Sequence, residues 1–251
     1  MADGYRADLE VDHAPYPMYE RIYLVLAAIF VVALVLTNII GIKLFRAPFN
    51  PEFALTTGIL TYPITFLVTD IVSEIYGKKR ADFMVFLGFG MSLLMLALVQ
   101  LALFVAPHPA WVPPAGAFYD SVEGYQHAFE SVFALNGILL FGSMLAYMSA
   151  QLVDNWLFHF WKRFTKGRHL WLRNNGSTMV SQLVDTLVVN SILFFVGFGM
   201  DLRTGFGIMA TIYAYKWVLA ICDTPLIYLA VWFVRKLLGD AVPSAEQQAV
   251  A

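Results

Sequence analysis

The sequence predicts an all-α, polytopic membrane protein with six transmembrane helices. Hydrophobic residues make up 59% of the chain and charged residues only 14%, with a mean hydropathy of +0.67. These values are far from those of an average soluble domain. Six apolar segments are each long enough to cross a hydrocarbon core of ~30 Å, which takes about 20 helical residues. They cover approximately residues 22–45, 55–76, 83–105, 132–158, 178–198 and 207–234.

Basic residues lie in alternate connections between these segments, which predicts the orientation of the chain. Lys78, Lys79 and Arg80 follow the second segment, and residues 162–173 contain five Lys or Arg. The connection 106–131 contains no Lys or Arg. Because positive residues favour the cytoplasmic side, both termini are expected in the cytoplasm. Six spans leave little of residues 1–251 for a soluble domain, so we expect a single membrane domain.

Two acids lie one helical turn apart inside the second apolar segment. Asp70 and Glu74 are four residues apart and therefore share a helix face. An ionisable side chain inside a bilayer costs roughly 2.5–3.5 kcal/mol even on a lenient scale, so such residues usually have a function. Asp70 lies eight residues before Lys78, roughly 12 Å from the cytoplasmic flank, whereas Glu74 is close enough to that flank to reach water.

Three further segments carry polar pairs at helical spacing. The fourth holds Gln151 and Asp154, and the fifth holds Gln182 and Asp185. In the sixth, seven residues, almost two turns, separate Lys216 from Asp223, which we expect to form a charge pair. Any one pair is as well explained by a hydrogen bond that holds two helices together. The whole set favours a polar solute site, because packing six helices does not require so many ionisable residues.

These residue types suit a small, flat solute with fixed hydrogen-bond donors. A carboxylate such as Asp70 or Asp185 accepts two N–H bonds from an amidine edge, as in a guanine-like base. Gln151, Gln182 and Asn38 are candidate secondary contacts, and the aromatic rings of Tyr62 and Phe66 are candidates to stack on the solute. The same residue types would serve many other polar solutes.

No metal, cofactor, catalytic residue or nucleic-acid partner is expected. The single cysteine, Cys222, lies in an apolar run, and His108 and His127 lack the spacing of a metal site. No nucleotide-binding motif is present. The aromatic connection 107–131 suits the headgroup zone or a cap over an outward opening. Ser177 or Thr178 is expected to cap the fifth helix after a turn.

Several motifs together resemble the queuosine precursor transporter family, formerly called putative vitamin uptake transporters. The resemblance covers about residues 20–238. The motifs are Tyr62-Pro63, Phe66-Leu67, Thr69-Asp70-Ile71-Val72-Ser73-Glu74-Ile75-Tyr76-Gly77, Ala146-Tyr147, Gln151-Leu152-Val153-Asp154, Arg173-Asn174-Asn175-Gly176-Ser177-Thr178, Gln182, Asp185-Thr186, Tyr215-Lys216, Pro225 and Tyr228.

The resemblance implies a multi-pass importer of the bacterial inner membrane. Its substrates would be 7-cyano-7-deazaguanine and 7-aminomethyl-7-deazaguanine, salvaged for queuosine in tRNA. One position departs from the family: Ile138 stands where members often have an arginine. The implied partners are a nucleobase-like small molecule and the lipid bilayer. A homodimer is a further possibility.

Other protein classes remain as alternatives. A substrate-binding subunit of a multicomponent vitamin-type transporter for another polar solute would have a similar architecture. A purely structural membrane protein would use the polar residues for packing alone. An intramembrane aspartyl protease is disfavoured, because Asp201 comes one residue too late for the usual glycine-aspartate signature. We therefore expect no enzyme.

Overall fold

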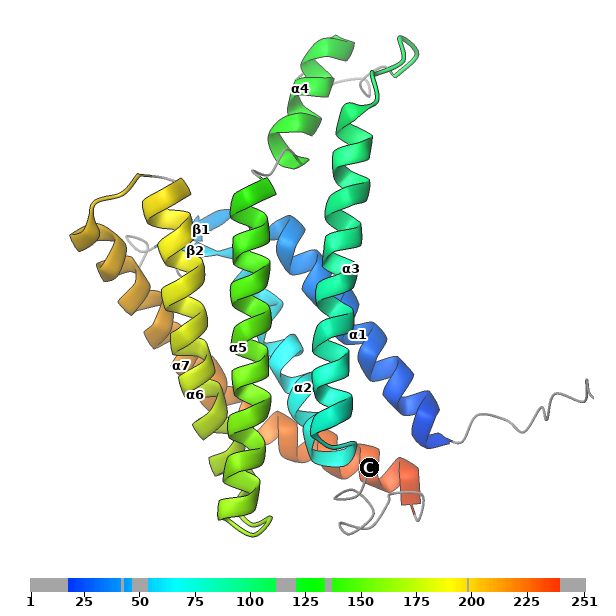
Figure 1. The fold of residues 1–251 in the computed structure, drawn as a ribbon, viewed down its shortest axis with the longest axis vertical. Helices are drawn as coiled ribbons and strands as arrows, with labels where there is room; N and C mark the ends of the chain where they lie inside the picture. Colours follow the sequence, from blue (N-terminus) through cyan, green and yellow to red (C-terminus); the bar gives the residue numbers. More distant parts are fainter. Residues whose placement is uncertain are drawn as a thin grey trace, which may run out of the picture.

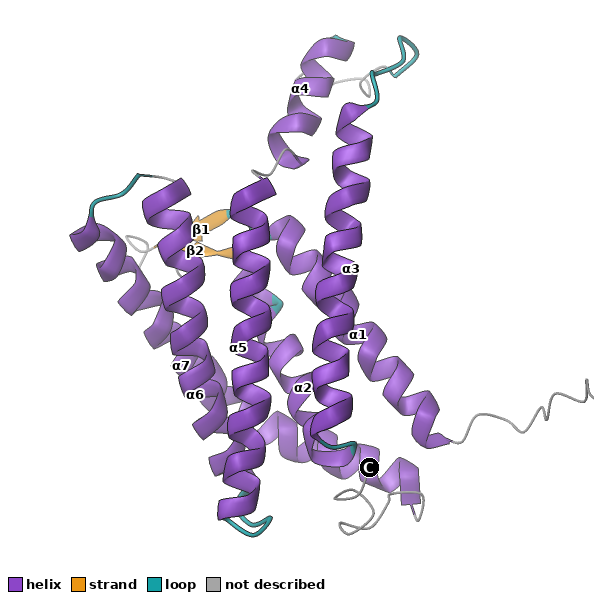
Figure 2. Cartoon of the chain, in the orientation of Figure 1, coloured by secondary structure: helices purple, strands orange, loops and turns teal. Residues whose placement is uncertain are grey.

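The fold is a bundle of long helices (Figures 1 and 2), seen in a computed structural model that describes residues 18–41, 43–46, 54–111, 121–133, 137–197 and 199–239. The elements are α1 (Met18–Ile40), β1 (Leu44–Arg46), β2 (Ala54–Thr56), a 3₁₀ turn (Thr57–Leu60), α2 (Tyr62–Ile75), α3 (Lys78–Phe104), α4 (Val122–Phe133), α5 (Gly137–Phe164), α6 (Leu170–Ser191), a π-helical turn (Ile192–Gly197) and α7 (Leu202–Leu238).

The six predicted segments correspond to α1, α2, α3, α5, α6 and α7. Four helical stretches in the described part of the chain are long and apolar enough to cross a membrane: α1, α3, α6 with its π-helical end, and α7. α2 has only 14 residues. A helical, multi-pass membrane protein is therefore confirmed, while six crossings and the cytoplasmic position of both termini stay predictions.

One short hairpin departs from an entirely helical fold. β1 and β2 pair antiparallel, with Leu44 opposite Thr56 and Arg46 opposite Ala54. The hairpin stands between the end of α1 and the start of α2, where its backbone groups bond to each other. Three-residue strands have too little alternation to be recognised in sequence.

α2 and α3 meet in a tight turn at the basic end of the bundle. Gly77 adopts a φ of 84° there, a left-handed conformation that suits a residue without Cβ. Pro63 lies in the first turn of α2, where no intrahelical N–H bond is lost. This connection places the basic residues Lys78–Arg80 directly after the end of α2.

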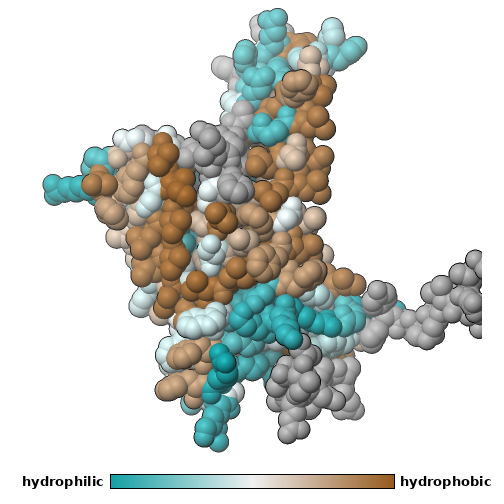
Figure 3. All heavy atoms as spheres, viewed as in Figure 1, coloured by the Kyte–Doolittle hydropathy of each residue, from teal (hydrophilic) through white to brown (hydrophobic). Residues whose placement is uncertain are grey.

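The interior packs an apolar core around α2 and leaves other apolar residues on the outside. Phe30, Val72, Met84, Phe158 and Ile227 are fully buried. Figure 3 shows hydrophobic residues gathered along the middle of one face, with hydrophilic ones at its two ends. Such a band suits lipid contact.

Two helix boundaries differ from the sequence predictions. α6 begins at Leu170, so Ser177 and Thr178 lie inside it, buried, and do not cap it. Part of the outer connection forms α4, whose Tyr125 ring lies 4.8 Å from the ring of Trp111. In both stretches the residues that favour a turn are outweighed by the helix-forming tendency of the residues around them.

α7 is the longest helix, and Figure 1 shows it changing direction part-way along. Pro225 lies inside it, and an internal proline removes a backbone hydrogen bond and bends a helix. As a result, α7 contacts both α6 and α2.

Candidate functional site

α6 has its polar residues inside the bundle. Ten of its eleven buried residues are polar, the exception being Leu170. Large apolar residues on the same helix, such as Leu183 and Val188, are exposed. Burial of so many polar side chains costs free energy unless they bond to one another or to a ligand. The interior beside α6 is therefore the candidate site.

α2 contributes a second polar face, which is joined to α5 by hydrogen bonds. The Thr69 hydroxyl donates to Gln151 Oε1 at 3.3 Å, and Ser73 Oγ donates to Asn155 Oδ1 at 3.2 Å. The Gln151 amide in turn donates to the Tyr147 hydroxyl at 2.5 Å. Gln151, a predicted site residue, is thus part of an interhelical network.

Asp70 and Asp154 face each other at the centre of this polar interior. Asp70 is 1% exposed and Asp154 is fully buried. The carboxyl group of Asp154 lies within hydrogen-bonding reach of that of Asp70. Neither carboxylate oxygen of Asp70 accepts a hydrogen bond from the part of the chain that the structure describes, whereas Asp154 Oδ1 accepts one from Ser181 at 2.8 Å. Three carboxylate oxygens of the pair are open.

Asp185 is neutralised by a cation from the neighbouring helix. The Lys216 ammonium lies 2.7 Å from Asp185 Oδ2, across the interface of α6 and α7. The expected partner of Lys216, Asp223, is half-buried two turns away on the same helix, so the prediction of a Lys216–Asp223 pair is replaced by a pair between helices. Asp185 Oδ1 and Gln182 Oε1 accept no hydrogen bond from the described residues.

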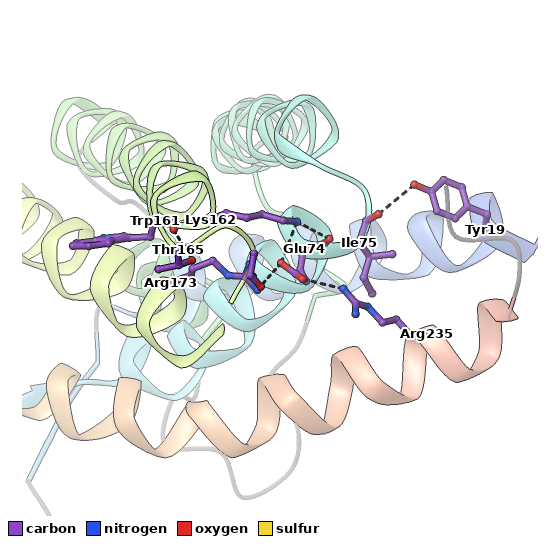
Figure 4. Close-up of polar contacts among 9 residues, drawn as sticks. Tyr19, Glu74, Ile75, Trp161, Lys162, Thr165, Arg173 and Arg235 are labelled. Carbon is purple, nitrogen blue, oxygen red and sulfur yellow. Dashed lines mark hydrogen bonds and ion pairs between the residues drawn. The ribbon is translucent and has the colours of Figure 1, made fainter. Parts of the chain in front are cut away.

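Glu74 is surrounded by three cations at the basic end of the bundle (Figure 4). Its carboxylate lies 3.1 Å from Lys162 of α5, 3.0 Å from Arg173 of α6 and 2.9 Å from Arg235 of α7. Lys162 also donates to the backbone oxygen of Glu74 at 3.1 Å. Glu74 therefore ties α2 to three other helices, and its side chain is already occupied.

The remaining predicted residues lie on the side of α1 and α3. Asn38 donates to Ser92 at 3.2 Å, and both line a small, partly open pocket together with Tyr147. Phe66 is buried with its ring edge-on to Tyr147 at 6.3 Å. The side chain of Tyr62 and that of Ile138 lie outside the described residues.

Sequence reasoning missed several members of the interior. Arg173 had been assigned to a basic connection, yet it is 2% exposed and its guanidinium lies 5.5 Å from the Phe158 ring. Its position eight residues before Ser181 fits the polar face of a helix, which is the signal that an earlier helix start would have revealed. Asn155, next to Asp154 in sequence, was also missed.

The arrangement suits binding of a neutral or cationic polar solute. It offers open oxygens on Asp70, Asp154, Gln182 and Asp185, which hydrogen-bond donors on a solute require, beside the open hydroxyl groups of Thr178 and Thr186. No group of three His, Cys, Asp or Glu that could hold a metal ion occurs among the described residues.

Comparison with known proteins identifies the family. The model of the putative vitamin uptake transporter family matches residues 56–230. The chain belongs to this family. It is also 31% identical over 176 residues to a probable queuosine precursor transporter of Bacillus subtilis (strain 168), an alignment that covers 70% of this chain and 71% of the relative. No solved structure matches the chain.

Family membership confirms the resemblance seen in the motifs and makes this chain a membrane transporter of a small molecule. The match covers α2, α3, α5 and α6 completely, together with most of α7. The polar interior described above thus lies within the part that this family shares.

Proposed function

We propose that this chain imports queuosine precursors, 7-cyano-7-deazaguanine and 7-aminomethyl-7-deazaguanine, across the bacterial inner membrane. The similarity to a probable queuosine precursor transporter of Bacillus subtilis supports this substrate class. Six crossings with cytoplasmic termini and one membrane domain complete the proposal, in agreement with the basic residues at the α2–α3 turn and at the α5–α6 connection.

The observation that carries the proposal is the buried Asp70 carboxyl group with both oxygens open. A guanine-like amidine edge presents two parallel N–H donors, and a carboxylate accepts both. Asp154 supplies a third open oxygen beside Asp70. A buried carboxyl group that accepts no hydrogen bond destabilises the empty site. A ligand that donates hydrogen bonds to it therefore gains binding free energy.

Other residues of the interior complete the proposed site. Gln182 and Asp185 present open oxygens on α6, next to the face that carries Asp154's partner Ser181. Gln151, Asn38, Tyr62 and Phe66 are secondary contacts for the carbonyl and the ring face of the base. In this proposal Lys216 holds Asp185 in place, Asp223 lines the same helix, and Glu74 fixes the helices around the site.

Uptake by cells tests the proposal. The full chain would be expressed alone in bacteria that neither make the precursors nor carry their own importer, and queuosine in tRNA would be measured after feeding 7-cyano-7-deazaguanine. We expect queuosine to appear with the wild-type chain and with Asp201→Asn, and to be absent with Asp70→Asn. Asp201 is a matched acid because it is exposed at the start of α7, where Asn also caps a helix.

Two outcomes would redirect the assignment. Import of guanine but of neither deazaguanine would contradict the substrate class. Uptake only in the presence of a separate energising membrane module would favour a substrate-binding subunit over a stand-alone carrier.

A further inference from the structure

The interior acids differ in how their negative charge is compensated. Glu74 lies within 3.1 Å of three cations, and Asp185 lies 2.7 Å from Lys216. Asp70 and Asp154 form no ion pair with any described residue, although both are at least as buried as Glu74 and Asp185. The negative charge of Asp70 and Asp154 is therefore not balanced by a cation among the described residues.

Two ionised carboxylates side by side in a buried site repel each other and lose their hydration. These costs are only partly offset, because the described residues donate hydrogen bonds to Asp154, chiefly from Ser181 at 2.8 Å, and provide no cation for either acid. If the two carboxyl groups share one proton, one of the two negative charges is removed, and the proton forms a hydrogen bond between the acids. The Ser181 bond stabilises part of the remaining negative charge on Asp154, and the proton is shared between the two acids.

The charged neighbours of the pair agree with this arrangement. The other charged groups near Asp70 are Asp223 of α7 and Glu74 of α2, and both are acids. The Lys and Arg residues that form ion pairs among the described residues of the surrounding helices are engaged elsewhere. They are Lys162 of α5, Arg173 of α6 and Arg235 of α7, all at Glu74, Lys216 of α7 at Asp185, Arg80 of α3 at Glu20 of α1, and Lys78 of α3 at Asp82.

We propose that Asp70 and Asp154 together bind one proton that is transported with the base, so that the chain is a proton-coupled importer. This inference rests on the proposed function, since it names the coupling ion of the same site. With one proton the pair keeps one negative charge, and that charge accepts the amidine edge of the base. Release of both proton and base on the cytoplasmic side returns the empty site.

Infrared spectroscopy of the reconstituted full chain tests the proton without any substrate. The C=O stretch of a protonated carboxylic acid is expected in the wild-type protein at neutral pH, and it should shift or disappear in Asp70→Asn and in Asp154→Asn, because a shared proton needs both acids. Asp201→Asn should keep it. If a variant does not reconstitute, labelling wild-type aspartate with ¹³C at the carboxyl carbon should shift the same band.

Absence of the band from the wild-type protein would overturn the proposal, as would a band that neither variant nor label affects. A band that disappears when sodium is added at constant pH would mean that the acids bind sodium instead.

Transport by the wild-type chain in vesicles separates this proposal from the proposed function. Counterflow of labelled 7-cyano-7-deazaguanine without any ion gradient tests whether the base is a substrate. An inward gradient of about one pH unit should then drive about tenfold accumulation for one proton per base. Counterflow without gradient-driven accumulation would overturn proton coupling and leave the importer intact. If counterflow fails, the proposed substrate is wrong, and the infrared band still decides whether the pair binds a proton.

Discussion

Asp70 and Glu74 lie one turn apart on α2, yet their side chains have opposite surroundings in the bundle. Glu74 is held by cations from α5, α6 and α7, whereas Asp70 faces another acid and accepts no hydrogen bond from the described residues. A charge that is fully paired contributes to the fold. A buried acid left unpaired costs stability, and natural proteins keep such sites where a ligand or proton uses them.

The largest effect on the fold is expected at Glu74. Glu74→Gln removes the negative charge and leaves three cations, one of them deeply buried, without their counter-ion. We expect a loss of about 3–5 kcal/mol in the free energy of unfolding, because breaking a buried ion pair leaves an uncompensated charge. Thermal unfolding in detergent would measure it. A melting temperature equal to that of the wild-type protein would contradict the structural role of Glu74.

Asp70→Asn should have the opposite signature. Uptake of the base should fall at least about 100-fold, because two charge-assisted hydrogen bonds contribute about 1.5–3 kcal/mol each. Thermal stability should stay equal or rise, since the substitution removes a buried acid that no cation compensates. Uptake by Asp70→Asn at the wild-type rate would remove Asp70 from the site.

Two arginines that pair with Glu74 differ mainly in burial, so they allow a matched comparison of how burial affects the contribution of an ion pair to stability. Arg173 is 2% exposed and Arg235 is 53% exposed, at nearly equal distances of 3.0 and 2.9 Å from the carboxylate. Arg173→Ala should cost about 2–3 kcal/mol, and Arg235→Ala less than about 1 kcal/mol, because water screens an exposed ion pair. Equal losses in a thermal unfolding series would show that exposure does not control this cluster.

The sequence predicted the segments that form α1, α2, α3, α5, α6 and α7 and the acids inside them, because apolar length and polar spacing are local properties of the chain. It did not predict which charges pair. Lys216 was assigned to Asp223 on its own helix, while the structure pairs it with Asp185 on α6. Arg173 was taken as a loop residue, since the start of α6 was placed eight residues too late. Pairing depends on how helices rotate against each other, which no periodicity within one helix encodes.

The smallest effect is expected at Ser181, whose hydroxyl donates to Asp154 at 2.8 Å between α5 and α6. Ser181→Ala should lower stability by about 0.6 kcal/mol, the average for hydrogen bonds between membrane helices. Ser149→Ala is the matched control, because Ser149 donates only to the Leu145 carbonyl on its own helix and is exposed. Urea or thermal unfolding of both variants would measure the difference. A loss of several kcal/mol at Ser181 would mean that the charge on Asp154 depends on this one donor, as Glu74 depends on its cations, and the contrast between the two acids of α2 would then extend to their partners on α5 and α6.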